Sequence, residues 1–553
     1  MILNHDKARS EIFALADAFI ERKAELNPIL ATMHGVPGHE HELPDFSLAG
    51  SAREADLTRS TLATLRSLTP IDDVDRIAGA VMSERLESEL ELLDSYEAHI
   101  LFSVLASPIS SIRQVFEVMP TSTSEDLSAI TARLKAVPSS HNSWRSSLRD
   151  LQAMGKRTAQ RQTAGVAKQL ATYGEGAYQG FAKRIDPHQS QSELLAAAVE
   201  ADRSCLDLSH WLSDSYFPNA NPVDPVGPER YARWARHHTG AALDLEETYR
   251  WGQGELDRIN DRMWEVAKRI KPGAKSLTEV AEHLDNDERY AIYGTDELLA
   301  KLRNFTDMTV SAMAGTHFDI DERIKFCDVR LAPEGSAAAP YYMPPNEDLS
   351  RPGTTWFPIL GHDRFNWWRL ASTWYHEAVP GHHLQCATVI IEKDRLSRFQ
   401  RTEGWTSGYG EGWALYAERL MDELGVFDEP GIEMGYLSNQ AMRAARVVVD
   451  IGMHLGFTGP DRNAWKAESA TKLMIERGLL EPDFAASEVD RYLGFPGQAI
   501  SYKVGERFWL EARESARQRL DERFSLKRFH AHTLRLGPMG LDPFAAEMAA
   551  WKG

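Results

Sequence analysis

An eight-residue run, HEAVPGHH at 376–383, constrains the fold most strongly, because a helix breaker interrupts a metal-binding pattern. In an HExxH helix the two histidines lie four residues apart on one face, with the glutamate beside them as general base. Here the fifth residue is Pro380, and His382 and His383 follow six and seven residues after His376. On an unbroken helix, position i+6 points roughly 120° away from i, and i+7 lies about 10 Å further along the axis. Neither histidine could then share a metal ion with His376.

The break at Pro380 offers a solution to this spacing problem. Proline has no amide hydrogen, and its ring collides with the carbonyl four residues earlier, which belongs to His376. Gly381 follows, and glycine accepts backbone angles that other residues resist. The sequence therefore predicts a two-residue bulge in the helix that returns the second histidine to the i+4 position.

The bulk composition is that of a soluble globular protein. The chain has 553 residues, of which 43% are hydrophobic and 26% are charged. A net charge of -19 argues against nucleic acid or an anionic membrane as a partner. The three cysteines, Cys205, Cys327 and Cys386, lie far apart without metal-type spacing, which favours a reducing compartment. The N-terminal stretch carries charges throughout and resembles an amphipathic helix more than a secretory signal. We expect a cytoplasmic protein without a membrane or nucleic-acid partner; its oligomeric state is left open.

Most of the chain is predicted to be helical. Apolar residues recur at three- and four-residue spacing in long segments punctuated by proline and glycine. These segments are 53–68, 72–106, 124–136, 190–213, 227–271 and 276–304 in the first half, and 364–395, 409–424, 432–456, 461–477 and 498–520 in the second. Because the helices are long and their connections short, we expect one large helical domain over 1–553, whose natural subdivision would be two lobes, 1–305 and 306–553.

Residues 322–360 are the exception to this helical pattern. The runs IKFCDVRLAP, AAAPYYMPP and GTTWFPIL are rich in β-forming residues and are separated by turn-forming ones. They predict a small antiparallel β-sheet beside the motif helix. An edge strand in that place could accept an extended substrate as a further strand. A sheet that only covers the core is the alternative.

A hydrolytic zinc ion needs two or three protein ligands and an open position for water. His376 and His382 are the first two candidates, with His383 as the rival for the second. The third should come from a neighbouring helix, where Glu411 lies between two glycines that leave room for close approach. Glu418, seven residues on, shares nearly the same helix face and is expected behind the ligands. Two alternatives stay open: Glu403 as the ligand, or Glu411 as a solvated acid favoured by the helix dipole.

Glu377 is the predicted general base. In this position it would take a proton from zinc-bound water and pass it to the leaving group. A buried histidine pair without any metal is the alternative interpretation of the whole motif.

A polar stripe on the predicted helix at 432–456 is the next candidate. Arg443, Arg446, Asp450 and His454 follow one another at steps of three, four and four, among apolar neighbours. Asp450 could pair with Arg446 and hold His454, which would then donate to the oxyanion formed when water attacks a carbonyl. A structural ion-pair network would explain the stripe equally.

Tyr502 is the second candidate for stabilising the oxyanion, because a phenol donates a hydrogen bond without competing for the metal. On the same segment, Gln498 and Lys503 could bind the substrate backbone or a terminal carboxylate. Tyr342 could line the cleft from its strand. Six tryptophans near the motif are expected to pack around the site helices; these are Trp356, Trp367, Trp368, Trp374, Trp405 and Trp413.

Together these motifs resemble a bacterial family known as domain of unknown function 885, which is grouped with the gluzincin metallopeptidases. The resemblance rests on five runs: NPILATMHG at 27–35, HEAVPGHHLQ at 376–385, EGWALYAE at 411–418, MRAARVVVDIGMH at 442–454 and PGQAISYKVG at 496–505. It implies a zinc-dependent, mainly α-helical fold with a long central cleft, similar to the helical gluzincin peptidases. In gluzincin aminopeptidases a NEGFA-like run supplies the glutamate ligand, and Glu411 matches that position.

We therefore expect a zinc metallopeptidase that acts on short peptides with one zinc ion. Arg443, Arg446 or Lys503 could read a peptide carboxylate, as in a carboxypeptidase or dipeptidase. A zinc hydrolase of an ester or modified amide would use the same site. Two histidines and a carboxylate also describe a non-haem iron site, although Glu377 favours hydrolysis. A helical binding protein with a relic site is the remaining alternative.

Overall fold

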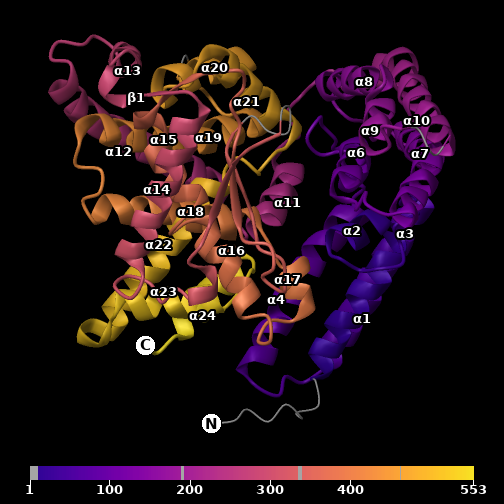
Figure 1. The fold of residues 1–553 in the computed structure, drawn as a ribbon, viewed down its shortest axis with the longest axis horizontal. Coiled ribbons are helices and arrows are strands. Elements are labelled where there is room, and N and C mark those ends of the chain that lie inside the picture. The colour runs from indigo at the N-terminus through magenta and orange to yellow at the C-terminus, as the bar shows by residue number, and fades with distance from the viewer. Residues whose placement is uncertain (1–9, 189–191, 334–338, 461) are drawn as a thin grey trace. The chain divides into compact units, whose positions relative to one another are not determined.

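The computed structural model describes residues 10–188, 192–333, 339–460 and 462–553. Over these residues the chain is mainly helical with small β-sheets, which confirms the predicted fold class (Figure 1). Parts of four predicted segments, at 1–9, 190–191, 337–338 and 461, lie outside the described residues. Among the described residues, no helix has the length and apolarity needed to cross a membrane. The long central cleft stays a prediction.

The chain divides into two compact units, with a boundary different from the one predicted. The first unit comprises 1–233 with 493–495, and the second comprises 234–492 with 496–553. The boundary therefore lies near residue 233, not near 305. The helix Leu245–Ile270 explains the difference, because it packs along the helix Pro430–Leu455 of the second unit. A Cβ on Gly252 would press against Val447, so the two helices approach closely there.

The first unit is built from helices around an apolar core. Its long helix α7 starts with a capping box, in which Thr123 and Asp126 each bond the other's backbone N–H. Its buried positions recur at helical spacing, as in Ile130, Leu134 and Val137, and pack against α10. The helices are α1 (Glu11–Leu26), α2 (Pro28–Met33), α3 (Leu48–Ser67), α4 (Asp73–Asp94), α5 (Glu97–Ile100), α6 (Pro108–Val118), α7 (Ser124–Ala153), α8 (Gln160–Gly174), α9 (Ala177–Ile185) and α10 (Ser192–Trp211); α11 (Pro228–Thr239) spans the boundary.

The second unit holds the predicted site. Its helices are α12 (Leu245–Ile270), α13 (Leu277–Asp285), α14 (Thr295–Met313), α15 (Trp367–Glu377), α16 (His382–Ile391), α17 (Arg398–Thr402), α18 (Ser407–Glu423), α19 (Pro430–Leu455), α20 (Ala467–Gly478), α22 (Ser501–Leu520), α23 (Leu526–Arg535) and α24 (Leu541–Ala550), and α21 (Pro482–Gly494) lies mostly within it. The helix α15 packs against both α18 and α19, and α18 packs against α22. Figure 1 shows α15, α18 and α19 gathered in the same part of the fold.

Glycines allow two of these helix pairs to approach at backbone distance. A Cβ on Gly435 of α19 would overlap the carbonyl of Trp368 on α15. Gly412 of α18 and Gly505 of α22 face each other, because a Cβ on Gly412 would lie 2.5 Å from the Gly505 backbone. The helices that carry the predicted ligands and Tyr502 are therefore held in direct contact.

The strands form two small sheets. In one, β1 (Ala291–Tyr293) pairs antiparallel with β5 (Arg364–Asn366). The other has the order β2-β4-β3, with β2 (Asp328–Leu331), β3 (Tyr341–Met343) and β4 (Thr354–Phe357). The pairing of β3 with β4 is antiparallel as predicted, but β2 pairs parallel with β4. Consecutive strands that neighbour each other pair antiparallel, but this chain places β4 between β2 and β3, which makes the pairing of β2 with β4 parallel.

Candidate metal centre

The helix break predicted at Pro380 is present and is longer than a two-residue bulge. The helix α15 ends at Glu377, and α16 begins at His382. The intervening loop is fixed by the indole N–H of Trp413, which donates to the carbonyls of Pro380 at 2.9 Å and Gly381 at 3.1 Å. Gly381 has a negative φ of -74°, so left-handed angles are not the reason for glycine. A Cβ there would overlap the carbonyl of His376, and close approach is the reason.

This loop brings the three predicted metal ligands together. One ligand atom each from His376, His382 and Glu411 lie within 4.8 Å of one another. Oε2 of Glu411 is 3.2 Å from Nε2 of His376 and 3.4 Å from Nε2 of His382. The donor set of two imidazole nitrogens and one carboxylate oxygen, with room for a further ligand, is one that catalytic zinc uses. The residues therefore fit a single zinc ion.

His383, the rival for the second ligand, is turned to other partners. Its Nε2 donates to the carbonyl of Ile324 at 2.8 Å, and its Nδ1 accepts from the hydroxyl of Tyr342 at 3.0 Å. Both ring nitrogens are thus used, and the side chain is buried. The geometry assigns His383 to tying the motif helix to β3 and to the turn at Glu322–Ile324.

Glu418 lies behind His376, as its helical spacing predicts. Its Oε1 is 2.9 Å from Nδ1 of His376, and its Oε2 accepts from the hydroxyl of Ser372. Arg443 approaches Oε1 at 3.6 Å. The bond to Nδ1 fixes the tautomer of His376 and leaves Nε2 facing Glu411. Sequence reasoning missed Ser372, although it lies one helical turn before His376 on the same face.

The charges of the centre are strongly coupled. Burial lowers the pKa of His376, but hydrogen bonds to Glu411 and Glu418 outweigh this effect and raise the pKa to about 9. Burial also raises the pKa of Glu411, yet the bonds to His376 and His382 hold it well below its usual range. Burial raises the pKa of Glu377 against the opposing effect of the two histidines. A cation at the position between the three ligand atoms would take over the role of the proton that they share.

Tyr502 lies at the edge of this centre. Its ring is stacked on that of His376, with centroids 6.3 Å apart. Burial and the charge of Glu411 raise the pKa of its phenol, while three arginines lower it. The guanidinium groups of Arg446 and Arg443 lie 4.8 Å and 5.8 Å from the Tyr502 ring. A neutral phenol is therefore held beside the ligands, as the predicted oxyanion role requires.

The polar stripe of α19 is buried, and its pairing follows the prediction in part. Nε2 of His454 lies 3.6 Å from Oδ1 of Asp450, as predicted. Arg446 bonds Glu488 at 2.7 Å and the hydroxyl of Tyr492 at 3.1 Å, instead of pairing with Asp450. Oδ2 of Asp450 accepts from the backbone N–H of Gly497 at 2.9 Å. Glu488, on another helix, was not singled out from the sequence, and no local spacing could have linked it to Arg446.

His454 and two residues near Tyr502 are likewise engaged in structural contacts. Nε2 of His454 donates to the carbonyl of Tyr492 at 3.0 Å, which favours packing over oxyanion binding. Lys503 is fully buried between Glu255 at 3.1 Å and Glu506 at 2.5 Å. Gln498 accepts from Arg491 at 2.6 Å. These bonds occupy the groups that substrate binding would have needed.

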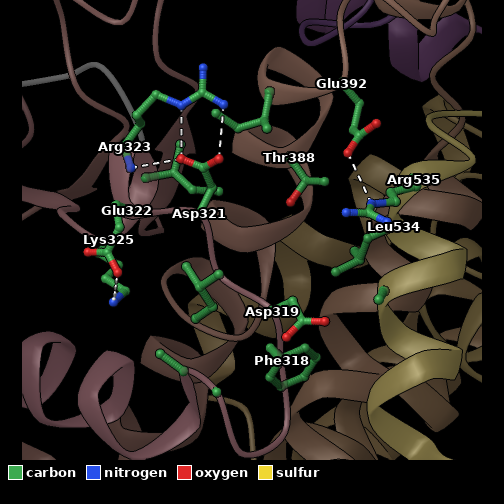
Figure 2. Close-up of a pocket in the computed structure, with 16 residues that line it drawn as sticks. Phe318, Asp319, Asp321, Glu322, Arg323, Lys325, Thr388, Glu392, Leu534 and Arg535 are labelled. Atoms are coloured by element: carbon green, nitrogen blue, oxygen red, sulfur yellow. Dashed lines mark hydrogen bonds and ion pairs between the residues drawn. The ribbon is translucent and has the colours of Figure 1, made fainter. Parts of the chain in front are cut away.

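A cavity of about 640 Å³ adjoins the motif helix on the side of His383 (Figure 2). It is lined by α16, α23 and the segment around Ile324, and the three ligand candidates are not among its lining residues. Figure 2 shows three ion pairs among its lining residues, Arg323 with Asp321, Lys325 with Glu322 and Arg535 with Glu392. Asp319 pairs with Lys527, outside the lining residues. Arg323 bonds Asp321 at 2.9 Å, and Arg535 lies 3.1 Å from Glu392. These pairs leave little free charge to attract an ionic ligand.

The fold is shared with solved bacterial structures. A protein described as a "putative lipoprotein" from Colwellia psychrerythraea has a TM-score of 0.85 at 21% identity, covering 98% of each chain. A "putative lipoprotein of unknown function" from Shewanella oneidensis has a TM-score of 0.78 at 18% identity, covering 97% of this chain and 99% of that one. At such identities the likeness shows the fold alone. A comparison with curated proteins gave no match.

These neighbours overturn the predicted cytoplasmic location. Both are described with the words "putative lipoprotein", and lipoproteins are held at membranes by attached lipid. The prediction rested on a low cysteine count and a charged N-terminal stretch. A large domain buries enough apolar surface to fold without disulfides, so few cysteines do not identify the compartment.

A family model matches residues 28–548, a range that includes the helix break, all three ligand candidates and Tyr502. The chain therefore belongs to the bacterial family described as "Bacterial protein of unknown function (DUF885)".

Proposed function

We propose that this protein is a zinc-dependent hydrolase, and specifically a metallopeptidase that acts on short peptides. One observation carries the proposal: His376, His382 and Glu411 each offer a ligand atom, and these atoms lie within 4.8 Å of one another. Glu377 directly follows His376 in the chain. Two neutral nitrogen donors and a carboxylate suit zinc, and an oxygenase would have no use for the adjacent glutamate.

The roles of the chain's own residues follow from their contacts. When bound, zinc would polarise the substrate carbonyl and make water a nucleophile near neutral pH. The Glu377 carboxylate would accept the proton of the attacking water and return it to the leaving nitrogen. The Tyr502 hydroxyl would donate a hydrogen bond to the carbonyl oxygen as negative charge develops on it. Glu418 would keep Nε2 of His376 directed at the centre.

Of the three side chains predicted to bind a substrate carboxylate, we keep Arg443 as the candidate. Of the three predicted readers, Arg446 and Lys503 are paired with buried glutamates. Arg443 also lies 3.6 Å from the buried Glu418, but its Nε has no hydrogen-bond partner among the described residues. A carboxypeptidase- or dipeptidase-like specificity therefore depends on Arg443.

The test combines metal analysis with a peptide library. Purified protein should contain about one zinc per chain by mass spectrometry, and the zinc-loaded protein should cleave members of the library. Glu377→Gln should keep the zinc and lose at least about a hundredfold in rate. Glu423→Gln, an exposed glutamate of α18 outside the triad, is the matched control and should keep both.

Other outcomes identify the alternatives. If the protein binds zinc and hydrolyses esters or modified amides but no peptide, it is a zinc hydrolase that uses the same metal centre on another class of substrate. Stoichiometric iron with oxygen-dependent turnover would replace hydrolysis by oxygenation. Pure protein that takes up no metal at all would rule out the proposal.

A further inference from the structure

Trp405 departs from the packing role expected for the tryptophans around the motif. Trp368, Trp374 and Trp413 are fully buried, but Trp405 is 40% exposed. Among the described residues its indole N–H has no hydrogen-bond partner. A large aromatic side chain that keeps this much surface in water, next to a candidate catalytic centre, has area left for a ligand.

The backbone around Trp405 is anchored on both sides. A Cβ on Gly404 would lie 2.7 Å from the carbonyl of Gln400, so this residue is pressed against its neighbours. The hydroxyl of Thr406 donates to the carbonyl of Met539 at 3.0 Å and accepts from the N–H of Tyr409 at 3.2 Å, which caps α18. The exposed ring is therefore presented from a fixed segment, and binding to it costs little conformational entropy.

The ring itself is seated beside two metal ligands. A Cβ on Gly410 would overlap the indole, so the ring lies directly on the backbone that precedes Glu411. The indole centroid is 6.4 Å from that of His382, at an interplanar angle of 49°. The indole is thus a fixed aromatic surface next to His382 and to the backbone of Glu411.

We propose that Trp405 forms a specificity subsite that binds an aromatic or large aliphatic side chain of the substrate, next to the bond that is cut. This inference rests on the proposed zinc-hydrolase function. An aromatic face gains from contact with another ring or an alkyl chain, and tryptophan is the strongest such anchor in protein interfaces.

The test measures binding, so that it does not depend on finding the natural substrate. Hydroxamates chelate zinc, and phenylalanine hydroxamate and alanine hydroxamate differ only in the side chain. Titration calorimetry on the zinc-loaded protein should give at least about tenfold tighter binding for the phenylalanine compound. Trp405→Ala should abolish that preference and leave the alanine compound within about twofold of its original affinity. Trp405→Phe should keep part of the preference.

The matched control is Trp551→Ala, because Trp551 stacks on His532 and belongs to the C-terminal end of the chain. This variant should keep the full preference. Zinc analysis of every variant separates the two proposals. If the wild-type protein binds no zinc, the proposed hydrolase function and the proposed subsite are both excluded. If zinc binds but Trp405→Ala keeps the preference for the phenylalanine compound, the subsite alone is excluded.

Discussion

Glu418 lies 2.9 Å from Nδ1 of His376, and both side chains are buried. The Glu418 carboxylate also accepts a hydrogen bond from the hydroxyl of Ser372, so both of its oxygens have a partner. This hydrogen bond sets the orientation of the His376 ring. The proton stays on Nδ1, so Nε2 faces the other ligands and can give its electron pair to a metal ion.

We expect Glu418→Ala to weaken zinc binding about 10- to 100-fold, since partners of this kind typically contribute that much to metal affinity. Competition with a fluorescent chelator would measure the affinity. Glu418→Gln should lie between wild type and Glu418→Ala, because its amide oxygen still accepts from Nδ1. Glu423→Gln, an exposed position on the same helix, should bind zinc as wild type does. Equal affinity in Glu418→Ala and wild type would contradict the positioning role.

The two adjacent histidines should separate cleanly by substitution. His382→Ala should lose most of the bound zinc, because Nε2 of His382 faces Glu411. His383→Ala should retain zinc and instead lower the free energy of unfolding by about 1–3 kcal/mol, since it leaves the buried Ile324 carbonyl without its bond. Metal content and denaturant unfolding measure the two effects. Loss of zinc in His383→Ala alone would reverse the ligand assignment.

Tyr502→Phe removes one hydroxyl from beside the metal centre. On a cleavable peptide we expect kcat to fall about a hundredfold with little change in KM, because the bond is made to the oxyanion and not to the ground-state carbonyl. Tyr492→Phe is a useful contrast, since its hydroxyl donates to Glu488 at 2.7 Å and its loss should lower stability instead. A kcat unchanged in Tyr502→Phe would remove the tyrosine from the mechanism.

The parts of the site that could be predicted from sequence are those fixed by local geometry. A proline in a helix interior removes a backbone hydrogen bond and favours a break, as at Pro380, and residues four or seven apart share a helix face in any fold. These rules were enough to group His376 with His382 and to place Glu418 on the same helix face as Glu411. The mainly helical class follows in the same way from the spacing of apolar residues.

Partners that are distant in the chain could not be predicted this way. The stripe on α19 suggested that Arg446 would pair one turn away, but a stronger partner, Glu488, comes from α21. The carbonyl of Ile324 that holds His383 carries no sequence signal, because every residue has one. The unit boundary near residue 233 is set by the packing of α12 on α19, which is equally non-local.

The glycine contact between α18 and α22 gives a prediction about stability. A Cβ on Gly505 would lie 2.6 Å from Cα of Gly412, and the two backbones have no room to accept it. Gly505→Ala should therefore lower the free energy of unfolding by at least about 2 kcal/mol. Gly254→Ala, on an exposed face of α12 with nothing within 4 Å of the new Cβ, should raise it by about 0.5–1 kcal/mol. Equal effects in the two variants would contradict the close approach.

A buried histidine away from the metal centre predicts a pH dependence of stability. Nδ1 of His530 donates to the carbonyl of His317 at 3.2 Å, and Nε2 accepts from the hydroxyl of Tyr416 at 2.8 Å. Burial lowers the pKa of His530 to about 3. The unfolded chain takes up a proton below pH 6.5 whereas the folded chain does not, so the contribution of His530 is complete above pH 6.5 and is lost as the pH falls towards 3.

The measurable quantity is the stability gap between wild type and His530→Gln. Glutamine can keep both hydrogen bonds but does not titrate. Between pH 8 and pH 5 the wild type should therefore lose about 2 kcal/mol of stability relative to His530→Gln. Denaturant unfolding with a chelator present excludes any effect of metal release. A constant gap would mean that His530 has the same pKa in the folded and the unfolded protein.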